Sequence, residues 1–387
     1  MTDRLYFDWN ATAPLRPQAR AAMLAALDIA GNPSSVHAEG RAARRLVEEA
    51  RERVAALVGA EPRNVVFTSG GTEANVLALA PASAADGKVC DRLLVSAIEH
   101  PSVLAGGRFA PAAVERLPVT ADGQLDLPAL ERRLALLGGR ALVSLMLANN
   151  ETGVVQPVSE AAHLTHEAGG LLHVDAVQGA GRIACDINAL GADLLTVSGH
   201  KIGAPKGVGA LIRRDADVPF PEPLIKGGGQ ERGVRAGTEN VAGIAGFGAA
   251  AAAARASLAA ESAHTAALRE RLETALKAAT PEVVFFGAGV ERLPNTTLFA
   301  VPGMKAETAV IAFDLDGVAV SSGAACSSGK VQPSHVLAAM GAPAQLARAA
   351  VRVSLGPTTT EPEVECFVKA WIKVSGALLK RSEGIAA

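Results

Sequence analysis

The chain has 387 residues, of which 49% are hydrophobic, so it can bury a large core and holds material for roughly two to three domains. Its 37 Lys and Arg residues nearly balance its 39 Asp and Glu residues, which leaves a formal net charge of −2. This balance excludes the strong field that attracts nucleic acid or an anionic membrane, so we expect small-molecule and protein partners, with no nucleic acid and no membrane.

Short apolar runs alternate with helical segments through most of the chain. Six runs predict strands, at residues 65–68, 92–96, 141–147, 171–174, 193–197 and 209–212. Between them, residues 41–57 and 127–137 carry apolar and charged side chains at helical spacing. This alternation predicts an α/β fold with a largely parallel sheet.

The composition changes near residue 241. Residues 241–279 are Ala-rich and predict helix, and short strands follow near residues 295–301, 317–320 and 351–355, before a final helix at 361–379. We expect a domain change inside the Ala-rich helix and a smaller α+β domain after it. No low-complexity linker separates the two parts, so we expect them to pack together.

The N-terminus and the cysteines indicate the compartment. Residues 1–8 show no basic region followed by an apolar one, and the most apolar stretch, 241–254, is too short and too weakly hydrophobic to span a bilayer. The cysteines form no C-x-x-C pair: they are Cys90, Cys185, Cys326 and Cys366. We therefore expect a cytoplasmic protein with no intrinsic metal, in which Cys90, Cys185 and Cys366 are buried, inert thiols.

The predicted strand at residues 193–197 is followed by Ser-Gly-His and then by Lys201, so Lys201 lies at the carboxyl end of this strand. A lysine at such a position faces a cleft and can form a Schiff base with an aldehyde. The alternative is a surface lysine that opens a loop, which is more common for a lysine considered alone. The residues at other strand ends favour the first interpretation.

A glycine turn follows the first predicted strand. Residues 66–75 run from that strand through Gly70 and Gly71 into a helix, with Thr72 in its first turn. Backbone N–H groups at such a helix start can bind phosphate, although a Gly-Gly turn is often only a tight connection. Neither this segment nor residues 323–331 have the spacing of a P-loop or a dinucleotide fingerprint, so nucleotide binding is disfavoured.

Asp175 and His100 follow two further apolar runs. The carboxylate could hold the ring nitrogen of a pyridine cofactor protonated, or it could simply cap a helix. The imidazole could stack on a flat ring and move protons near neutral pH, although most lone histidines do neither. Together with the glycine turn and Lys201, these residues supply the parts of a pyridoxal phosphate site.

With these residues in place, the chain resembles the cysteine desulfurases of the class V aminotransferase family, which have the pyridoxal phosphate fold type I. The specific motifs are Ser-Gly-His-Lys at residues 198–201 and Ser-Ser-Gly-Ala-Ala-Cys at residues 321–326; the match runs nearly end to end, with further motifs at residues 6–14, 31–35, 148–153, 227–233 and 352–356. The resemblance implies a large cofactor-binding domain over residues 15–255, with a mostly parallel seven-stranded sheet between helices. It implies a small α+β domain made of residues 1–14 and 256–387, which carries a mobile cysteine loop at about residues 321–332.

The resemblance also implies pyridoxal 5′-phosphate as the cofactor and a role for each matching residue. Lys201 would hold the cofactor covalently. Its phosphate would be bound by Gly71, Thr72, Ser198, Gly199 and His200 and, from the neighbouring subunit of a homodimer, by Thr238. The residues expected at the ring are His100, Asn150, Asp175 and Gln178. Those expected at the substrate are Asn150, Arg352 and Asn10, with the guanidinium of Arg352 as carboxylate clamp.

Cys326 decides which reaction the resemblance implies. It lies among Gly, Ala and Ser residues, so we expect a mobile loop rather than a packing position. L-Cysteine would lose its sulfur to the Cys326 thiolate, giving L-alanine and a persulfide, while Lys201 takes the Cα proton and His100 the thiol proton. The sulfur would then pass to an acceptor such as an iron–sulfur scaffold protein, and Cys326 is the residue that would ligate a transient iron–sulfur cluster.

Alternatives remain open from the sequence. A class V transaminase or a selenocysteine lyase would use the same lysine and would be recognised by a keto acid product or a strict selenium preference. A non-catalytic sulfur carrier would show no cofactor absorbance that responds to cysteine. The sequence also leaves open whether the sulfur serves general iron–sulfur assembly, nitrogenase maturation or tRNA thiolation.

Overall fold

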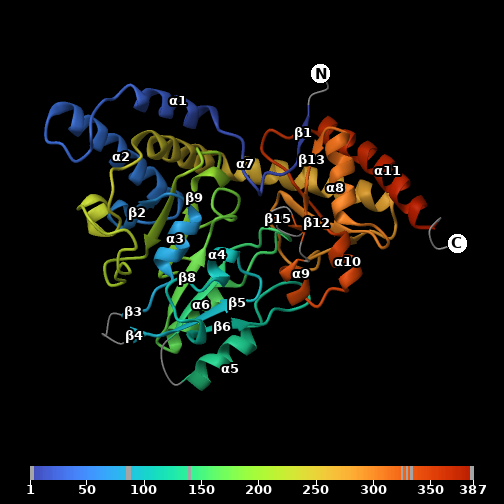
Figure 1. Cartoon of the computed structure of the whole chain (residues 1–387), viewed down its shortest axis with the longest axis horizontal. Helices are drawn as coiled ribbons and strands as arrows, with labels where there is room; N and C mark the ends of the chain where they lie inside the picture. The colour runs from blue at the N-terminus through green and yellow to red at the C-terminus, as the bar shows by residue number, and fades with distance from the viewer. Residues whose placement is uncertain are drawn as a thin grey trace.

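The computed structural model describes residues 4–83, 89–137, 141–323, 326–327, 330–331 and 334–383. Figure 1 shows two parts side by side, one formed by the blue to green elements and one by the orange and red C-terminal elements. The expected α/β class is confirmed, with a mostly parallel central sheet in the first part and a smaller antiparallel sheet in the second.

The central sheet has seven strands in the spatial order β2 (Val65–Thr68), β10 (Gly209–Arg213), β9 (Leu194–Ser198), β8 (Leu171–Asp175), β7 (Ala141–Met146), β5 (Arg92–Ser96) and β6 (Val114–Leu117). β10 is antiparallel to both neighbours, and the other pairs that adjoin directly are parallel. Every residue of β7, β8 and β9 is buried, as expected when helices cover both faces of a parallel sheet. These strands therefore appear in the sequence as mostly apolar runs, with Ser144, His173 and Thr196 inside them.

Helices cover this sheet and set the first hydrophobic core. They are α1 (Pro17–Leu27), α2 (Ala38–Leu57), α3 (Gly71–Ala78), α4 (Pro101–Leu104), α5 (Leu127–Leu137), α6 (Val158–Glu167) and the first half of α7 (Val241–Ala279), with short 3-10 turns η1 (Pro62–Asn64), η2 (Pro111–Ala113), η3 (Gly199–Lys201) and η4 (Gln230–Gly233). Buried side chains of α2, α7 and the sheet strands form one continuous cluster.

The second part is built on a four-stranded antiparallel sheet. Its strands are β11 (Val284–Phe285), β12 (Thr296–Ala300), β17 (Val351–Ser354) and β14 (Ser321–Ser322), and its helices are α8 (Ala306–Leu315), α9 (His335–Ala339), α10 (Ala344–Ala349) and α11 (Glu361–Glu383). Its core contains a chain of aromatic contacts: the Phe299 and Trp371 ring centroids are 5.1 Å apart, and those of Phe313 and Phe367 are 5.2 Å apart. Such pairs stabilise beyond the area they bury.

The described residues also form three pairs of two-residue strands. β1 (Leu5–Tyr6) pairs with β13 (Val318–Ala319) in the second part, β3 (Ala82–Ser83) pairs with β4 (Val89–Cys90), and β15 (Cys326–Ser327) pairs with β16 (Lys330–Val331). The N-terminal segment thus joins the C-terminal part. The domain limits at residues 14/15 and 255/256 stay a prediction.

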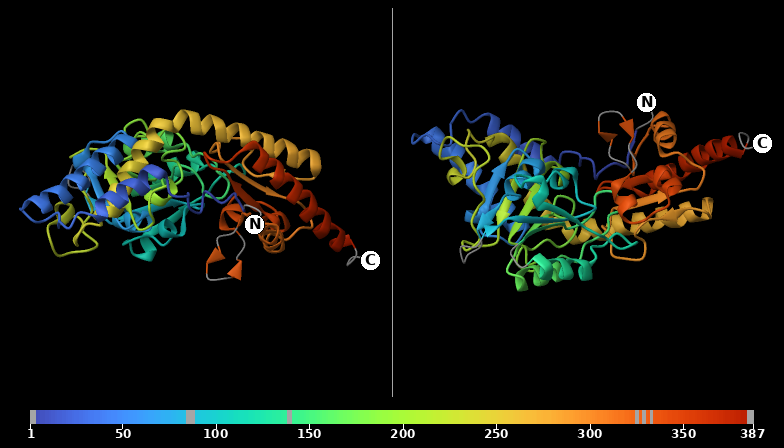
Figure 2. Two further views of the ribbon diagram at one scale, coloured as in Figure 1. Left: turned by 90° about the horizontal axis from the view of Figure 1, so that it is seen from above. Right: turned by 60° about the horizontal axis from the view of Figure 1, so that its bottom comes forward.

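Helix α7 connects the two parts. Figure 2 shows that this helix runs from the first part into the second. Ala254 belongs to the first core and Leu268 to the second, so one uninterrupted helix packs into both. Among the described residues, α7 is the one helix long and apolar enough to cross a membrane by length and composition, with mean hydropathy 1.4 in its most apolar window. More than half of that window, 56%, is buried inside the protein, as in a core helix.

The expectation of three buried thiols is wrong for Cys366, which is exposed. The buried face of α11 is formed by Val364, Phe367, Trp371 and Val374, at the spacing of one helix face. Cys366 falls between these positions, on the solvent side. Cys90 and Cys185 are buried as expected.

Candidate active site

The predicted site residues meet at one edge of the central sheet. β2, β5, β8 and β9 run in the same direction, so their carboxyl ends share an edge, where open α/β sheets bind ligands. A cavity of about 450 Å³ lies there. It is lined by the predicted residues Asn10, Gly71, Thr72, His100, Asn150, Asp175, Gln178, Ser198, His200, Lys201 and Arg352.

Three predicted residues are placed differently. Gly199 is buried at the start of η3, behind the lining residues. Thr238 is exposed in the loop after η4 and does not line the cavity of this single chain. The backbone of Cys326 lies in β15, in the segment that follows the lining residues Ser321 and Ser322, but its side chain falls outside what the structure describes.

Lys201 ends η3 directly after β9, and its amine lies beside the N-terminal segment. Nζ donates hydrogen bonds to the carbonyl oxygens of Asn10 and of Ala11, the latter at 2.9 Å. Burial lowers the Lys201 pKa from its ordinary value to about 7, helped by the cations of Arg182 and Arg352. An amine with this pKa is available in its neutral, nucleophilic form near neutral pH.

Asp175 is the last residue of β8, and both of its oxygens are held in place. Oδ1 accepts the Val177 backbone N–H at 3.0 Å, and Oδ2 accepts Asn75 Nδ2 at 2.8 Å. The side chain is almost completely buried but lines the cavity. A carboxylate has about four acceptor sites, so Asp175 can still accept a hydrogen bond from a protonated ring nitrogen.

The glycine turn after β2 forms a concave surface at the start of α3. Its N-cap, Gly70, provides no side-chain cap for the first N–H groups, which leaves them available to an anion. A Cβ added at Gly71 would lie 2.9 Å from Val177 Cγ2 and 3.3 Å from Ser198 Cβ, so only glycine leaves this space. His200 lines the same cavity, and burial lowers its pKa to about 4, with Lys201 adding to the effect.

Arg352 and Asn10 define the other end of the cavity. Arg352 donates from Nη2 to Asp8 Oδ1 at 2.6 Å and from Nη1 to the Asn150 carbonyl oxygen at 2.9 Å. Its Nε is buried without a hydrogen-bond partner among the described residues. Asn10 Nδ2 donates to Thr296 Oγ1 at 2.9 Å. The guanidinium is thus oriented by the protein, and two of its five N–H groups are used in these bonds.

The expected contact of Gln178 with the cofactor's phenolic oxygen stays a prediction. In this structure the Gln178 amide is hydrogen-bonded to the protein: Nε2 donates to the Asn10 carbonyl oxygen at 3.1 Å and Oε1 accepts from Arg182. Arg182 is itself partly buried, and this burial lowers its pKa to about 10. Gln178 lines the cavity as expected.

Sequence reasoning missed several polar residues of the cavity, Asn75, Ser102 and Glu151 among them. Asn75 lies one helical turn after Gly71, so the i, i+4 spacing within α3 could have indicated it. Glu151 Oε2 accepts the Ser334 hydroxyl at 2.5 Å, and burial raises the Glu151 pKa to about 7. No local pattern could have indicated a contact across such a separation in the chain.

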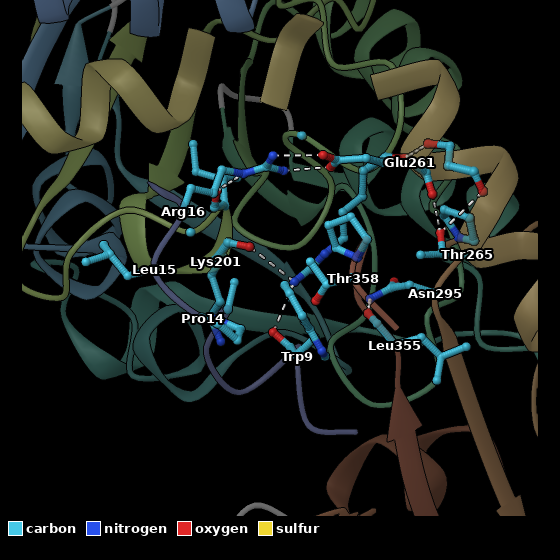
Figure 3. A pocket seen from close by; sticks show the side chains of 18 of the residues that line it. Trp9, Pro14, Leu15, Arg16, Lys201, Glu261, Thr265, Asn295, Leu355 and Thr358 are labelled. Atoms are coloured by element: carbon cyan, nitrogen blue, oxygen red, sulfur yellow. Dashed lines mark hydrogen bonds and ion pairs between the residues drawn. The ribbon is translucent and has the colours of Figure 1, made fainter. Parts of the chain in front are cut away.

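A second cavity, of about 360 Å³, shares Lys201 with the first. Figure 3 shows its lining side chains, which come from the N-terminal segment, from α7 and from the end of β17. Arg16 and Glu261 form a two-pronged ion pair across it, at 2.8 and 2.6 Å. Besides Lys201, its lining includes two residues whose side chains bond to side chains of the predicted set: Asn295 Nδ2 donates to Asn10 Oδ1 at 3.2 Å, and Arg182 donates to Gln178.

The groups in the first cavity fit pyridoxal phosphate. The space that a Cβ would fill at Gly71 and the uncapped start of α3 suit a phosphate. The anchored carboxylate of Asp175 suits a protonated pyridine nitrogen, and the low-pKa amine of Lys201 suits an aldehyde.

Comparison with known proteins agrees with this geometry. The family model described as Aminotransferase class-V matches residues 5–367. A cysteine desulfurase of Cereibacter sphaeroides is 46% identical over 369 residues, covering 94% of this chain and 93% of the relative. An IscS-like cysteine desulfurase of Mycobacterium tuberculosis is 41% identical over 373 residues, covering 94% of each. A NifS-like protein from Rickettsia africae has a similar structure, with a TM-score of 0.87, 38% identity, and coverage of 96% of this chain and 99% of that one.

The chain therefore belongs to the class-V aminotransferase family, and its relatives put it among the cysteine desulfurases of that family.

Proposed function

We propose that this protein is a pyridoxal-phosphate-dependent cysteine desulfurase that converts L-cysteine to L-alanine and leaves the sulfur as a persulfide on Cys326. The observation that carries the proposal is the single cavity that gathers Gly71, His100, Asp175 and Lys201, in a chain similar over nearly its whole length to cysteine desulfurases. The same residues would suit a transaminase. The cysteine-bearing segment after Ser322 favours the desulfurase.

The residues proposed to hold the cofactor form two groups, one at its phosphate and one at its ring. The start of α3, with Gly71 and Thr72, together with Ser198 and His200, would bind the phosphate. Asp175 would bind the ring nitrogen, with His100, Asn150 and Gln178 around the ring. When bound, pyridoxal phosphate withdraws electrons from the substrate α-carbon and so makes its C–H bond acidic.

Lys201 would act at the α-carbon of the substrate, and Arg352 would bind its carboxylate. The pKa of Lys201, lowered by burial to about 7, suits an amine that takes and returns the α-proton near neutral pH. Arg352 lines the cavity and would bind the substrate carboxylate with Nη hydrogens that Asp8 and Asn150 leave unused. Asn10 would support the substrate beside it.

Cys326 would accept the sulfur. Its thiolate attacks the substrate sulfur, the substrate C–S bond breaks, and a proton replaces sulfur on the β-carbon, so that one cysteine and one enzyme thiol give one alanine and one enzyme persulfide. The persulfide would then pass its sulfur to an acceptor protein. We propose an iron–sulfur scaffold as that acceptor, and the IscS-like name of one relative supports this.

The assembly is proposed to be a homodimer in the cytoplasm. Thr238 is exposed and outside the cavity of its own chain, as required of a residue that completes the phosphate site of a neighbouring subunit. The exposed free thiol of Cys366 is compatible with the reducing conditions of the cytoplasm.

Product analysis tests the function directly. The purified enzyme is incubated with L-cysteine and a thiol reductant, and alanine, sulfide and keto acid are measured together. We expect equal amounts of alanine and sulfide and no keto acid. Pyruvate or another keto acid as the main product would indicate a transaminase or lyase instead, and turnover restricted to selenocysteine would indicate a selenocysteine lyase.

A further inference from the structure

The imidazole of His100 is held at one of its two nitrogens. His100 is the N-cap of α4, where Nδ1 accepts the backbone N–H of Ser102 at 3.2 Å. A backbone N–H can only donate, so Nδ1 must present a lone pair to it. In a neutral imidazole with Nδ1 unprotonated, the proton is on Nε2.

The side chain of Ser102 supports the same assignment. Ser102 Oγ lies 2.7 Å from His100 Nδ1 and accepts Asn75 Nδ2 at 2.9 Å. Because Asn75 Nδ2 also donates to the Asp175 carboxylate at 2.8 Å, which can only accept, the orientation of the Asn75 amide is fixed. With Asn75 as donor to its oxygen, the Ser102 hydroxyl directs its own proton at His100 Nδ1.

The protonation state follows from the surroundings of the ring. Partial burial lowers the His100 pKa, the Asp175 carboxylate opposes this, and the charges of Lys201 and His335 lower it further. His100 is therefore neutral near neutral pH. Its hydrogen bonds to described residues all involve Nδ1, and the ring lines the cavity, so the Nε2–H side of the ring is the one available to a ligand.

We propose that Asn75 and Ser102 are positioning residues that hold neutral His100 as the Nε2–H tautomer, so that it donates a hydrogen bond to the substrate sulfur instead of accepting the thiol proton. This differs from the role that the sequence implied for His100. In this tautomer Nε2 carries a hydrogen and has no lone pair in the ring plane, so it can donate to the substrate sulfur but cannot accept the proton of the substrate thiol. The second half of the proposal rests on the proposed function, and the tautomer itself does not.

Nitrogen-15 NMR of the full-length, cofactor-loaded enzyme, labelled at its eight histidines, measures the tautomer without turnover. His100→Gln identifies the His100 signals by their loss. We expect Nε2 protonated and Nδ1 unprotonated in the wild type. Ser102→Ala removes the hydroxyl that stabilises the neutral ring and keeps the backbone N–H, so we expect a higher His100 pKa, a shifted Nδ1 signal, and about a tenfold lower kcat/KM for L-cysteine, the effect of one hydrogen bond. Ser102→Thr, which keeps the hydroxyl, should restore the wild-type signals.

A matched control is available at the buried pair of Ser144 and His173, where Ser144 Oγ lies 2.8 Å from His173 Nδ1. Ser144→Ala should shift only the His173 signals and leave those of His100 unchanged. A wild-type His100 with its proton on Nδ1, or a Ser102→Ala enzyme with the wild-type Nδ1 signal and His100 pKa, overturns the proposal. Failure of the desulfurase function itself would appear separately, as absence of alanine and sulfide with the His100 tautomer as expected.

Discussion

The buried ion pair between Arg51 and Glu231 should control the loop that leads to Thr238. Glu231 accepts Arg51 Nη1 at 2.7 Å, Arg51 Nη2 at 2.9 Å and the Phe67 backbone N–H at 2.9 Å. Glu231 and Arg232 also have positive φ angles of 46° and 57°, a conformation that costs non-glycine residues about 1 kcal/mol or more each. The three hydrogen bonds to Glu231 therefore hold η4 in a strained shape.

The perturbation is Glu231→Gln, which keeps the shape of the side chain and removes its charge. The two side chains are only 4% and 2% exposed, so the change leaves a buried guanidinium without its main partner, and the new amide NH₂ faces N–H donors. Breaking a buried pair from one side costs about 3–5 kcal/mol. Glu48, 3.0 Å from Arg51 Nε but 41% exposed, compensates in part, so we expect about 3 kcal/mol.

Urea unfolding of the wild type and Glu231→Gln measures this loss, with cofactor release from the loaded enzyme as a second readout. The matched control is Glu222→Gln at the exposed pair with Lys226, whose side chains are 70% and 68% exposed; it should leave the free energy of unfolding nearly unchanged. We expect Glu231→Gln also to release the cofactor faster, because Thr238 is displaced. A loss below about 1 kcal/mol with unchanged release would refute the reasoning.

Three further outcomes follow from the same structure. Gly71→Ala should weaken pyridoxal phosphate binding at least about tenfold, because its Cβ would lie 2.9 Å from Val177 Cγ2; equal affinity in a cofactor titration would contradict this. Lys201→Ala should abolish the borohydride-stable link between protein and cofactor, as read by absorbance after dialysis. Burial raises the Glu99 pKa to about 8, so the folded state binds a proton that the unfolded chain releases near pH 4.5, and stability should fall by on the order of 3 kcal/mol between pH 5 and pH 8. Glu99→Gln should remove this decline in urea unfolding, and an unchanged pH dependence would show that Glu99 is not its source.

Most of the fold could be predicted because its strands are buried on both faces. The runs at β7, β8 and β9 are mostly apolar, and the predicted ends of each agree with the structure to within one residue. β6 was missed because Glu115 and Arg116 interrupt it at the edge of the sheet, where one side faces solvent. The exposed position of Cys366 was missed because a thiol alone does not show which side of a helix it occupies.

The site was predictable as far as its residues follow strand ends. Lys201 and Asp175 each come directly after an apolar run, and parallel strands bring such positions together. The hydrogen-bond chain through Asn75 and Ser102, and the contact of Glu151 with Ser334, join residues from different elements. These contacts depend on the packed backbone, so the sequence alone could not predict them.

The central claim is that Lys201 and Cys326 act in one reaction, and peptide mass spectrometry after brief incubation with L-cysteine tests it most directly. The wild type should carry one extra sulfur atom on the Cys326 peptide, and Lys201→Ala should carry none. The exposed Cys366 is the internal control and should stay unmodified in both. Sulfur found on Cys366 but absent from Cys326, or an equally sulfurated Cys326 in Lys201→Ala, would contradict the account.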